Sequence, residues 1–442
     1  MPSGELVADT IAAIATPIGR GAIGLVRISG PKVPEIARMV LGRVPEPRKA
    51  LLCTFRDASG GRVDEGIALH FKAPHSYTGE AVLELQGHGG PVVLHAVLGA
   101  VLDAGARLAE PGEYTRRAFL NGRLDLAQAE AVADLIDAAS REAARSALRS
   151  LSGEFSDAIQ ALVAGLTELR ALTEAMLDFP AEEVDSLHRD DARARLAAVQ
   201  GALEDVLARS RQGSLLRTGI QVVLAGRPNV GKSSLLNRLA GEERAIVTAI
   251  PGTTRDALRE SIQIEGVPIV IVDTAGLHES GEEVERLGME RTRMEMERAD
   301  IVLVVLEAGR MEAPDGPLPA AAARINVVNK IDLVPGAVPG GRGDQVHVSA
   351  KTGAGLDALR QAVLEAAGWR SQGESVFLAR ARHLHALARA RGHLAAAMEQ
   401  EMQWEFFAEE LRLAQEALGE ITGRVTADDL LGEIFSRFCI GK

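Results

Sequence analysis

Residues 220–234 read IQVVLAGRPNVGKSS, an apolar run followed by a glycine-containing loop, a lysine and two serines. Gly226, Gly231, Lys232 and Ser233 satisfy the phosphate-loop pattern, and the helical pattern SLLNRLAG follows at once. In such a loop, backbone N–H groups surround phosphates, the lysine reaches the β- and γ-phosphates, and the hydroxyl is placed for Mg²⁺. A glycine-rich turn that binds no ligand can carry the same pattern. The downstream sequence must therefore show whether this loop binds a nucleotide.

Downstream, apolar runs alternate with helical patterns as far as about Gly368. The runs are IQVVLA, VPIVIVD, DIVLVVL, INVVN and QVHVSA. Alternation of this kind is typical of a parallel sheet covered by helices. We therefore expect an α/β domain over residues 218–375.

Three further motifs follow the predicted strands in order: DTAG from Asp273, NKID ending at Asp332, and SAK from Ser349. Asp273 is suited to hold Mg²⁺ through water. NKID and SAK resemble the guanine-reading motifs of the Ras-like GTPase superfamily. The resemblance implies that Asp332 accepts from guanine N1 and N2, that Asn329 and Lys330 frame the base, and that the SAK backbone contacts O6.

These motifs and the segment TAIPGTTRD predict a site for GTP. Three of the seven lysines of the chain fall within it. The expected GTP-binding residues are Asn229, Val230, Gly231, Lys232, Ser233, Ser234, Thr248, Ala249, Ile250, Pro251, Gly252, Thr253, Thr254, Asp273, Thr274, Ala275, Gly276, Asn329, Lys330, Asp332, Ser349, Ala350 and Lys351.

The position after DTAG is Leu277, where many Ras-like GTPases have a water-positioning glutamine. A leucine cannot orient water, so another group must position the nucleophile and neutralise the charge that develops between the phosphates. The phosphate loop and TAIPGTTRD resemble those of GTPases that use a bound K⁺ ion. An arginine finger from Arg255 is the competing explanation.

The potassium resemblance implies a specific set of ligands. Mg²⁺ would be held by Ser233 and Thr254. The K⁺ ion would be held by the side chain of Asn229 and by the carbonyl groups of Thr248, Ile250 and Thr253.

The 442-residue chain is long enough for about three domains. No apolar run approaches the roughly 20 residues that span a bilayer, and the N-terminus lacks the basic start of a secretory signal, so we expect a cytoplasmic protein without a membrane partner.

The two cysteines of the chain argue against a disulfide framework and a dedicated zinc site. We expect Cys53, in LLCTF, to be a buried, inert strand residue. A net charge of −12 disfavours a broad nucleic-acid footprint but permits a local basic patch.

The composition and periodicity of the sequence change three times along the chain. Short β-rich stretches (IGLVRIS, GIALHF, AVLELQG) and one helical run make up the start, which predicts an α+β domain. Ala/Leu/Glu/Arg-rich helical patterns follow, break at Asp178, resume to about Leu216, and return after the α/β region. These changes predict an N-terminal domain at 1–120, a discontinuous helical domain at 121–217 and 376–442, and the inserted domain at 218–375.

The chain closes with DDLLGEIFSRFCIGK. Gly441 and Lys442 fit a prenylation signal badly. A packed amphipathic helix is the better interpretation of DDLLGEIFSRF, with its apolar residues along one side. These are Leu430, Leu431, Ile434, Phe435 and Phe438.

The GTPase motifs, together with LVRISG and ELQGHGGP near the start and RFCIGK at the end, make the sequence resemble the MnmE family, also called TrmE. The resemblance covers the whole chain. Members of that family are tRNA-modification GTPases that act on the wobble uridine. It implies a folate-binding-like, dimerising N-terminal domain, a split helical domain and an inserted Ras-like P-loop GTPase domain.

The resemblance also implies roles for residues outside the nucleotide motifs. Glu285, in EEVERLGMER, would activate the attacking water through a bridging water, although this acidic stretch could equally begin an exposed helix. Cys439 would lie near the one-carbon unit, as nucleophile, acid or packing residue. A formyl-tetrahydrofolate-type ligand would be bound by Arg27, Glu84, Arg123 and Lys442, although some relatives carry lysine at position 123.

The implied reaction adds an aminomethyl or carboxymethylaminomethyl group to C5 of uridine 34 in tRNA. The one-carbon donor would be 5-formyl- or methylene-tetrahydrofolate. Since no G-x-G-x-x-G fingerprint follows a strand, the flavin must come from elsewhere. In the family, an FAD-binding MnmG subunit supplies it, and the homodimer and MnmG form a heterotetramer.

Two other classes of GTPase fit the sequence less well. A ribosome-assembly GTPase binds RNA without covalent chemistry, but such proteins usually append a basic RNA-binding module that this acidic chain does not show. A dynamin-like mechanical GTPase acts on membranes, but no apolar or basic anchoring helix is evident. The tRNA-modification hypothesis is therefore favoured.

Overall fold

The computed structural model describes residues 9–17, 19–178, 186–242, 259–273, 299–312, 322–370, 376–399, 403–424, 428–436, 438–439 and 441. The chain forms two compact units. The first comprises Met1–Ala133 and Gly419–Lys442, and the second comprises Asp134–Leu418. Since α4 (Leu126–Ile136) and α12 (Trp404–Thr422) each cross a boundary between the units, the three-domain division above stays a prediction.

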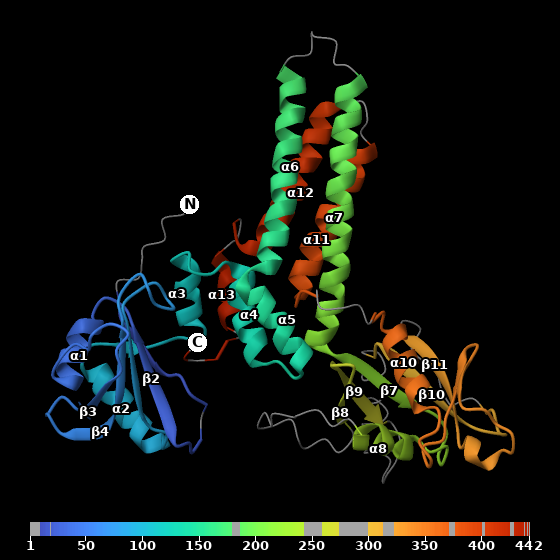
Figure 1. The fold of residues 1–442 in the computed structure, drawn as a ribbon, viewed down its shortest axis with the longest axis horizontal. Helices are drawn as coiled ribbons and strands as arrows, with labels where there is room; N and C mark the ends of the chain where they lie inside the picture. Colours follow the sequence, from blue (N-terminus) through green and yellow to red (C-terminus); the bar gives the residue numbers. More distant parts are fainter. Residues whose placement is uncertain are drawn as a thin grey trace, which may run out of the picture. The chain divides into compact units, whose positions relative to one another are not determined.

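The first unit is built on a six-stranded sheet in the order β3-β4-β5-β2-β1-β6 (Figure 1). All neighbouring strands are antiparallel except β1 and β6. The three β-rich stretches noted in the sequence form strands, as predicted. The strands are β1 (Ile11–Ile14), β2 (Ile23–Ser29), β3 (Leu51–Arg56), β4 (Arg62–Phe71), β5 (Val82–His88) and β6 (Arg107–Leu108).

The sheet of the first unit separates two cores. Because side chains alternate along a strand, Ala12 of β1 packs into the core that contains α1 (Val33–Leu41) and α2 (Pro91–Asp103). Its neighbours Ile11 and Ala13 face the other way and pack with Tyr114. Tyr114 belongs to α3 (Glu113–Leu120), so α3 lies against the sheet face opposite to α1 and α2.

The predicted C-terminal helix is present as α13 (Asp428–Ser436). Leu431, Ile434 and Phe435 are buried against α4, as its amphipathic pattern indicates. The prediction placed Phe438 on this helix, but the helix ends at Ser436 and Phe438 packs from beyond it into the same cluster. The side chain of Leu430 lies outside the described residues.

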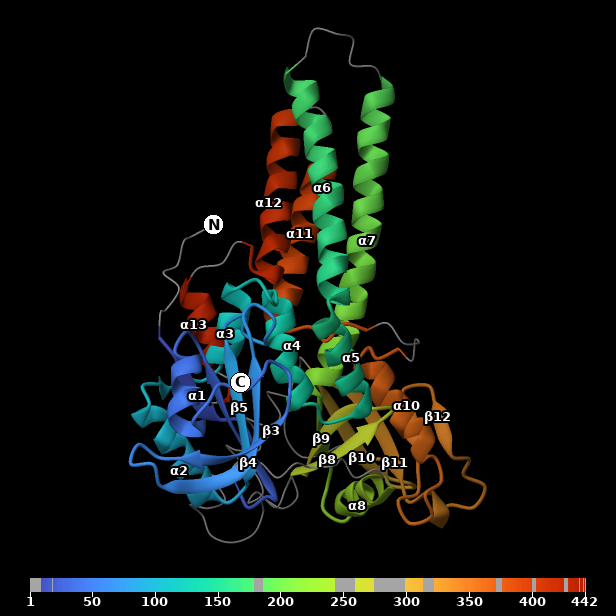
Figure 2. The same cartoon turned by 60° about the vertical axis from the view of Figure 1, so that its left-hand side comes forward.

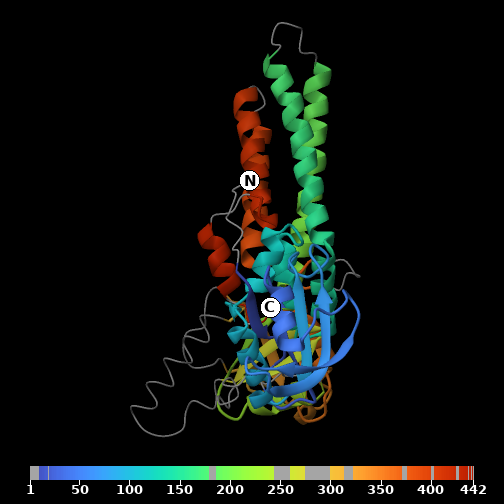
Figure 3. The same cartoon turned by 90° about the vertical axis from the view of Figure 1, so that its left-hand side faces the viewer.

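Long helices form one part of the second unit (Figure 3). They are α5 (Arg141–Ser152), α6 (Glu154–Asp178), α7 (Ser186–Thr218), α11 (Ala381–Glu399) and α12. Helix α7 packs on both α6 and α11, and Gln200 of α7 donates to the carbonyl of Leu394 in α11 at 3.0 Å. Helix α6 ends at Asp178, the break predicted from the sequence. None of the described helices is long and apolar enough to cross a membrane.

The other part of the second unit is a seven-stranded sheet in the order β12-β13-β11-β10-β7-β9-β8 (Figure 2). Strands β13, β11, β10, β7 and β9 are parallel, as predicted, but the edge strands β8 and β12 are antiparallel to their neighbours. One face packs against α8 (Lys232–Glu242) and α10 (Leu356–Ala366). The strands are β7 (Ile220–Ala225), β8 (Arg259–Ile264), β9 (Val267–Asp273), β10 (Ile301–Glu307), β11 (Ala323–Asn329), β12 (Gly340–Arg342) and β13 (Gln345–His347).

Candidate functional site

The phosphate-loop motif connects β7 to α8, in the strand-to-helix context that it requires. Lys232 is buried, and its Nζ atom donates to the carbonyls of Gly226 at 2.6 Å and Arg227 at 2.9 Å. Asn229 is exposed and takes a left-handed conformation with φ 66°. The loop therefore curves around the lysine ammonium group, with Ser233 exposed on the first turn of α8.

Asn329, at the end of β11, joins the phosphate loop to the SAK segment. Its Nδ2 donates to the carbonyl of Val230 at 3.0 Å, and its Oδ1 accepts from the N–H of Ala350 at 3.0 Å. All three residues are buried, so these hydrogen bonds satisfy groups that water cannot reach. One side chain thus brings together two motifs that lie far apart in sequence.

A second link, between Asp332 and Ser349, joins the NKID and SAK motifs. The hydroxyl of Ser349 donates to Asp332 Oδ1 at 2.6 Å, which fixes the carboxylate beside the SAK segment. Lys330, which begins the short helix η2 (Ile331–Leu333), forms an ion pair of 3.2 Å with Glu307 of β10. Lys351 is exposed. The described part of the chain therefore gathers the phosphate loop and both guanine motifs at the carboxyl ends of neighbouring parallel strands.

Several predicted site residues cannot be placed. Asp273 ends β9, but its side chain lies outside the described residues. Arg437, which lies two residues before Cys439 in sequence, also lies outside them. The same holds for Thr248, Ala249, Ile250, Pro251, Gly252, Thr253, Thr254, Arg255, Thr274, Ala275, Gly276, Leu277, Glu285 and Lys442.

In the first unit, Arg27 and Glu84 face each other on β2 and β5. Arg27 Nε donates to Glu84 Oε1 at 3.0 Å, and both side chains are mostly buried. Within the described residues, Glu84 Oε2 accepts no hydrogen bond. Arg123, the third predicted folate ligand in the described residues, is exposed just before α4, and the structure gives no contact between it and this pair.

Sequence reasoning missed two aromatic residues beside Arg27. Its guanidinium carbon lies 5.8 Å from the ring centres of both Tyr77 and Tyr114, and the Tyr114 hydroxyl donates to the Arg27 carbonyl at 2.6 Å. Burial raises the pKa of both tyrosines, so the phenols stay neutral and can donate. These are the only tyrosines in the sequence, a scarcity that could have singled them out.

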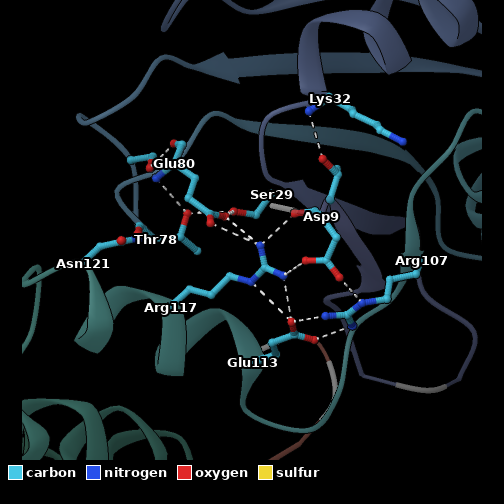
Figure 4. A network of polar contacts seen from close by, with 11 residues as sticks. Asp9, Ser29, Lys32, Thr78, Glu80, Arg107, Glu113, Arg117 and Asn121 are labelled. Carbon is cyan, nitrogen blue, oxygen red and sulfur yellow. Dashed lines mark hydrogen bonds and ion pairs between the residues drawn. The ribbon is translucent and has the colours of Figure 1, made fainter. Parts of the chain in front are cut away.

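A larger polar network on α3 was also missed (Figure 4). Arg117 is only 6 % exposed and uses all three side-chain nitrogen atoms, which bond Asp9, Glu80 and Glu113. Glu113 also binds Arg107 through both of its oxygen atoms, at 2.6 and 2.8 Å. Arg107 in turn pairs with Asp9. The i,i+4 spacing of Glu113 and Arg117 was a local signal for one pair, but the contacts with Asp9 and Glu80 join separate segments that no local pattern brings together.

The two cysteines lie in different surroundings. Cys53 is on β3, as predicted, but is half-buried rather than buried, and burial raises the pKa of its thiol. Cys439 is exposed, and its carbonyl accepts from the N–H of Gly112 at 3.4 Å. The C-terminal segment therefore docks at the start of α3.

The class of protein follows from features that lie on one sheet. They are the phosphate loop, the aspartate that ends β9, and the NKID and SAK motifs, which Asn329 joins to the loop. The chain is a P-loop GTPase.

Comparison with known proteins adds the family. The family described as MnmE helical domain matches residues 126–439, and the family described as GTP-binding protein TrmE N-terminus matches residues 10–123. The chain is 60 % identical to the tRNA modification GTPase MnmE of Azoarcus sp. and 59 % identical to that of Thiobacillus denitrificans, with 98 % of each chain covered. That of Neisseria meningitidis serogroup C is 56 % identical over 98 % of this chain and 99 % of the relative. The chain belongs to the MnmE family.

Solved structures resemble parts of the chain. The G domain of the T. maritima FeoB iron transporter is 25 % identical over 34 % of this chain and 98 % of that chain, with a TM-score of 0.23. Aquifex aeolicus Era, bound to GDP and AlF4⁻, is 25 % identical over 39 % and 66 %, with a TM-score of 0.24. TM-scores this low carry no structural argument, so the class rests on the motifs and their geometry.

Proposed function

We propose that this GTPase of the MnmE family works with an FAD-dependent MnmG-type subunit to modify C5 of uridine 34 in certain tRNAs. The product would carry an aminomethyl or carboxymethylaminomethyl group. The observation that carries the proposal is the coexistence, in one chain, of a guanine-specific phosphate-loop site and the Arg27–Glu84 pair. Relatives named tRNA modification GTPase, covered almost end to end, support the substrate class.

The nucleotide site supports GTP as the energy source. Asp332, held by Ser349, offers its carboxylate to the N1–H and the exocyclic N2 amino group of guanine, a pair of donors that adenine lacks. Lys232 would exchange its carbonyl partners for phosphate oxygens. The exposed Ser233 hydroxyl would help to hold Mg²⁺, which neutralises charge on the β- and γ-phosphates.

Potassium would be the second cation of this site and would neutralise the charge that develops between the β- and γ-phosphates. Asn229 is the one proposed K⁺ ligand among the described residues, and its left-handed backbone keeps it exposed at the turn of the loop. Thr248, Ile250 and Thr253 would supply the other oxygens. Glu285 would activate the attacking water, with Arg255 as the alternative source of positive charge.

The Arg27–Glu84 pair would bind the folate donor. Glu84 Oε2 could accept from the N–H donors of a pterin ring, while the remaining guanidinium N–H groups of Arg27 suit an anionic or carbonyl oxygen. Arg123 and Lys442 would contact the glutamyl portion. A tetrahydrofolate derivative supplies the one-carbon unit when it is bound.

The partners are proposed on the same basis. A homodimer formed by the N-terminal domains would assemble with the MnmG-type subunit and tRNA. GTP-driven meeting of the two G domains would then act as a conformational drive.

Reconstitution tests the proposal. Purified chain, the FAD-binding partner, unmodified tRNA, GTP and tetrahydrofolate carrying a ¹³C one-carbon unit should yield a wobble nucleoside with ¹³C on its C5 substituent. Omission of GTP or of this chain should abolish the label. Label that appears without this chain would contradict the proposal.

A further inference from the structure

The C-terminal segment is held between two surfaces of the first unit. A Cβ atom on Gly112, which has φ 67°, would lie 2.7 Å from the carbonyl oxygen of Phe435 and 2.9 Å from Phe438 Cβ. A Cβ atom on Gly441 would lie 2.6 Å from the carbonyl oxygen of Ile14, at the end of β1. The backbone around Cys439 therefore fits closely between the start of α3 and the end of β1.

The ionic network joins these two surfaces. Asp9 lies two residues before the start of β1, and Arg107 is paired with Ile11 across the β1–β6 ladder. Glu113 and Arg117 belong to α3, so the pairs of Asp9 with Arg107 and Arg117 tie α3 to β1 and β6 (Figure 4). If these pairs are lost, the apolar cluster of Ile11, Ala13, Ala109 and Tyr114 still joins the two surfaces, but their relative position is less tightly fixed.

The same end of α3 also contacts the Arg27–Glu84 pair. Gly112 binds the carbonyl of Cys439, and two residues later Tyr114 binds the carbonyl of Arg27. On the next residue, Thr115 shares a 2.8 Å hydrogen bond with the Tyr77 hydroxyl. The start of α3 thus contacts both the thiol segment and the Arg27 strand.

We propose that Arg107, Glu113 and Arg117 are positioning residues that fix α3 and, through it, hold the Cys439 segment in register with the Arg27–Glu84 pair. The network acts by geometry, because Arg117 is saturated by protein partners. Its use in catalysis rests on the proposed folate-dependent function. The positioning itself can be measured without folate, tRNA or a partner.

Hydrogen–deuterium exchange of the intact chain tests the proposal. It gives separate rates for the Gly112 N–H, which donates to the Cys439 carbonyl, and for the Gly42 N–H, which donates to the Arg38 carbonyl at the end of α1. In Arg107→Gln and in Glu113→Gln, the docked state of the C-terminal segment should open more often, and the Gly112 rate should rise by about fivefold, the shift that loss of roughly one hydrogen bond produces. The Gly42 rate should stay unchanged, since α1 lies on the opposite face of the sheet.

The Gly42 N–H distinguishes positioning from general loosening. Arg62→Gln removes an exposed ion pair with Glu65 on β4 and serves as the matched control, for which neither rate should change. In the double variant Arg107→Gln/Glu113→Gln, the rise in the Gly112 rate should be smaller than the product of the two single rises, because the two residues share one contact. If Glu113→Gln does not fold, Arg107→Gln alone tests the proposal. Arg107 is the more exposed partner, so its replacement disturbs the core less.

An unchanged Gly112 rate, or an equal rise at Gly42, would overturn the proposal. Failure of the proposed function gives a different result. If the Gly112 rate responds as expected but Cys439→Ser still supports full tRNA modification, positioning stands and the proposed chemical role of the thiol does not. If the positioning and the chemical role of the Cys439 thiol are both correct, Arg107→Gln should lower kcat for tRNA modification severalfold and leave folate affinity unchanged.

Discussion

The side chain of Asn329 donates a hydrogen bond to the carbonyl of Val230 over 3.0 Å and so joins the guanine motif NKID directly to the phosphate loop. Since the same side chain also accepts from Ala350, it couples base recognition to the position of the loop that holds phosphates. Truncation should therefore affect nucleotide binding as a whole.

Asn329→Ala should weaken GTP binding about tenfold to a hundredfold, because it removes the two buried hydrogen bonds that hold the phosphate loop and the SAK segment in position for the nucleotide. Isothermal titration calorimetry with GDP and GTP would measure this. Asn326→Ala, on the same strand, is the control, since its side chain bonds the exposed Arg324 and Asp344. Equal affinities for the two variants would show that the link has no energetic role.

Glu84→Gln should weaken binding of 5-formyl-tetrahydrofolate by about tenfold or more, because charge-assisted hydrogen bonds are worth roughly 1.5–3 kcal/mol. Fluorescence or calorimetric titration of the purified chain would give the dissociation constants. Glu65→Gln, which removes an exposed carboxylate from the same sheet, should bind normally. Unaltered affinity in Glu84→Gln would exclude this carboxylate as a ligand.

The network around Glu113 predicts a pH dependence of stability. Burial acts to raise the pKa of Glu113, but donors from Arg107, Arg117 and the Glu110 N–H outweigh it and hold the pKa below its usual value. A carboxylate of this kind stabilises the fold fully above its unfolded-state pKa, and this contribution is lost as the pH falls through the lower folded-state value. Glu113→Gln should therefore destabilise the protein by roughly 3 kcal/mol at neutral pH.

Thermal unfolding of wild type and Glu113→Gln at a series of pH values would check this. The difference between their melting temperatures should be large near neutrality and should shrink below about pH 4.5. A constant difference across the series would mean that the ionised carboxylate is not the stabilising species.

Replacement of K⁺ by Na⁺ should lower GTP turnover at least tenfold, because a cation between the β- and γ-phosphates stabilises the charge of the transition state. Phosphate release by wild type, Asn229→Ala and Arg255→Ala would be compared in both salts. The potassium hypothesis requires that Arg255→Ala stays active in K⁺. Equal turnover in the two salts, with loss of activity in Arg255→Ala, would favour the arginine finger instead.

Much of the G region could be predicted from the sequence because its signals are local. An apolar strand, a phosphate loop and a helix follow one another within residues 220–242, and the helix break at Asp178 precedes Pro180. The antiparallel edges were missed for a physical reason. Strand β8 contains charged residues at Arg259 and Glu260, and β12 begins with two glycines, so neither shows the apolar run of a buried parallel strand.

The surroundings of the candidate folate site could not be predicted in the same way. Arg117 and Asp9 lie 108 residues apart in sequence, and Tyr114 meets Arg27 only because α3 packs across the sheet. Contacts of this kind depend on tertiary packing, which hydrophobic periodicity does not encode. The resemblance to a family supplied Arg27 and Glu84 but gave no sign of the residues that hold them.

The most direct test of the central claim is mass spectrometry of wobble-position nucleosides from cells that lack this gene. The proposal predicts that C5 of uridine 34 is unmodified in the affected tRNAs, that wild type restores the modification, and that Lys232→Ala does not. Fully modified wobble uridine in the deletion strain, especially with accumulated ribosomal precursors, would contradict the claim and favour a ribosome-assembly GTPase.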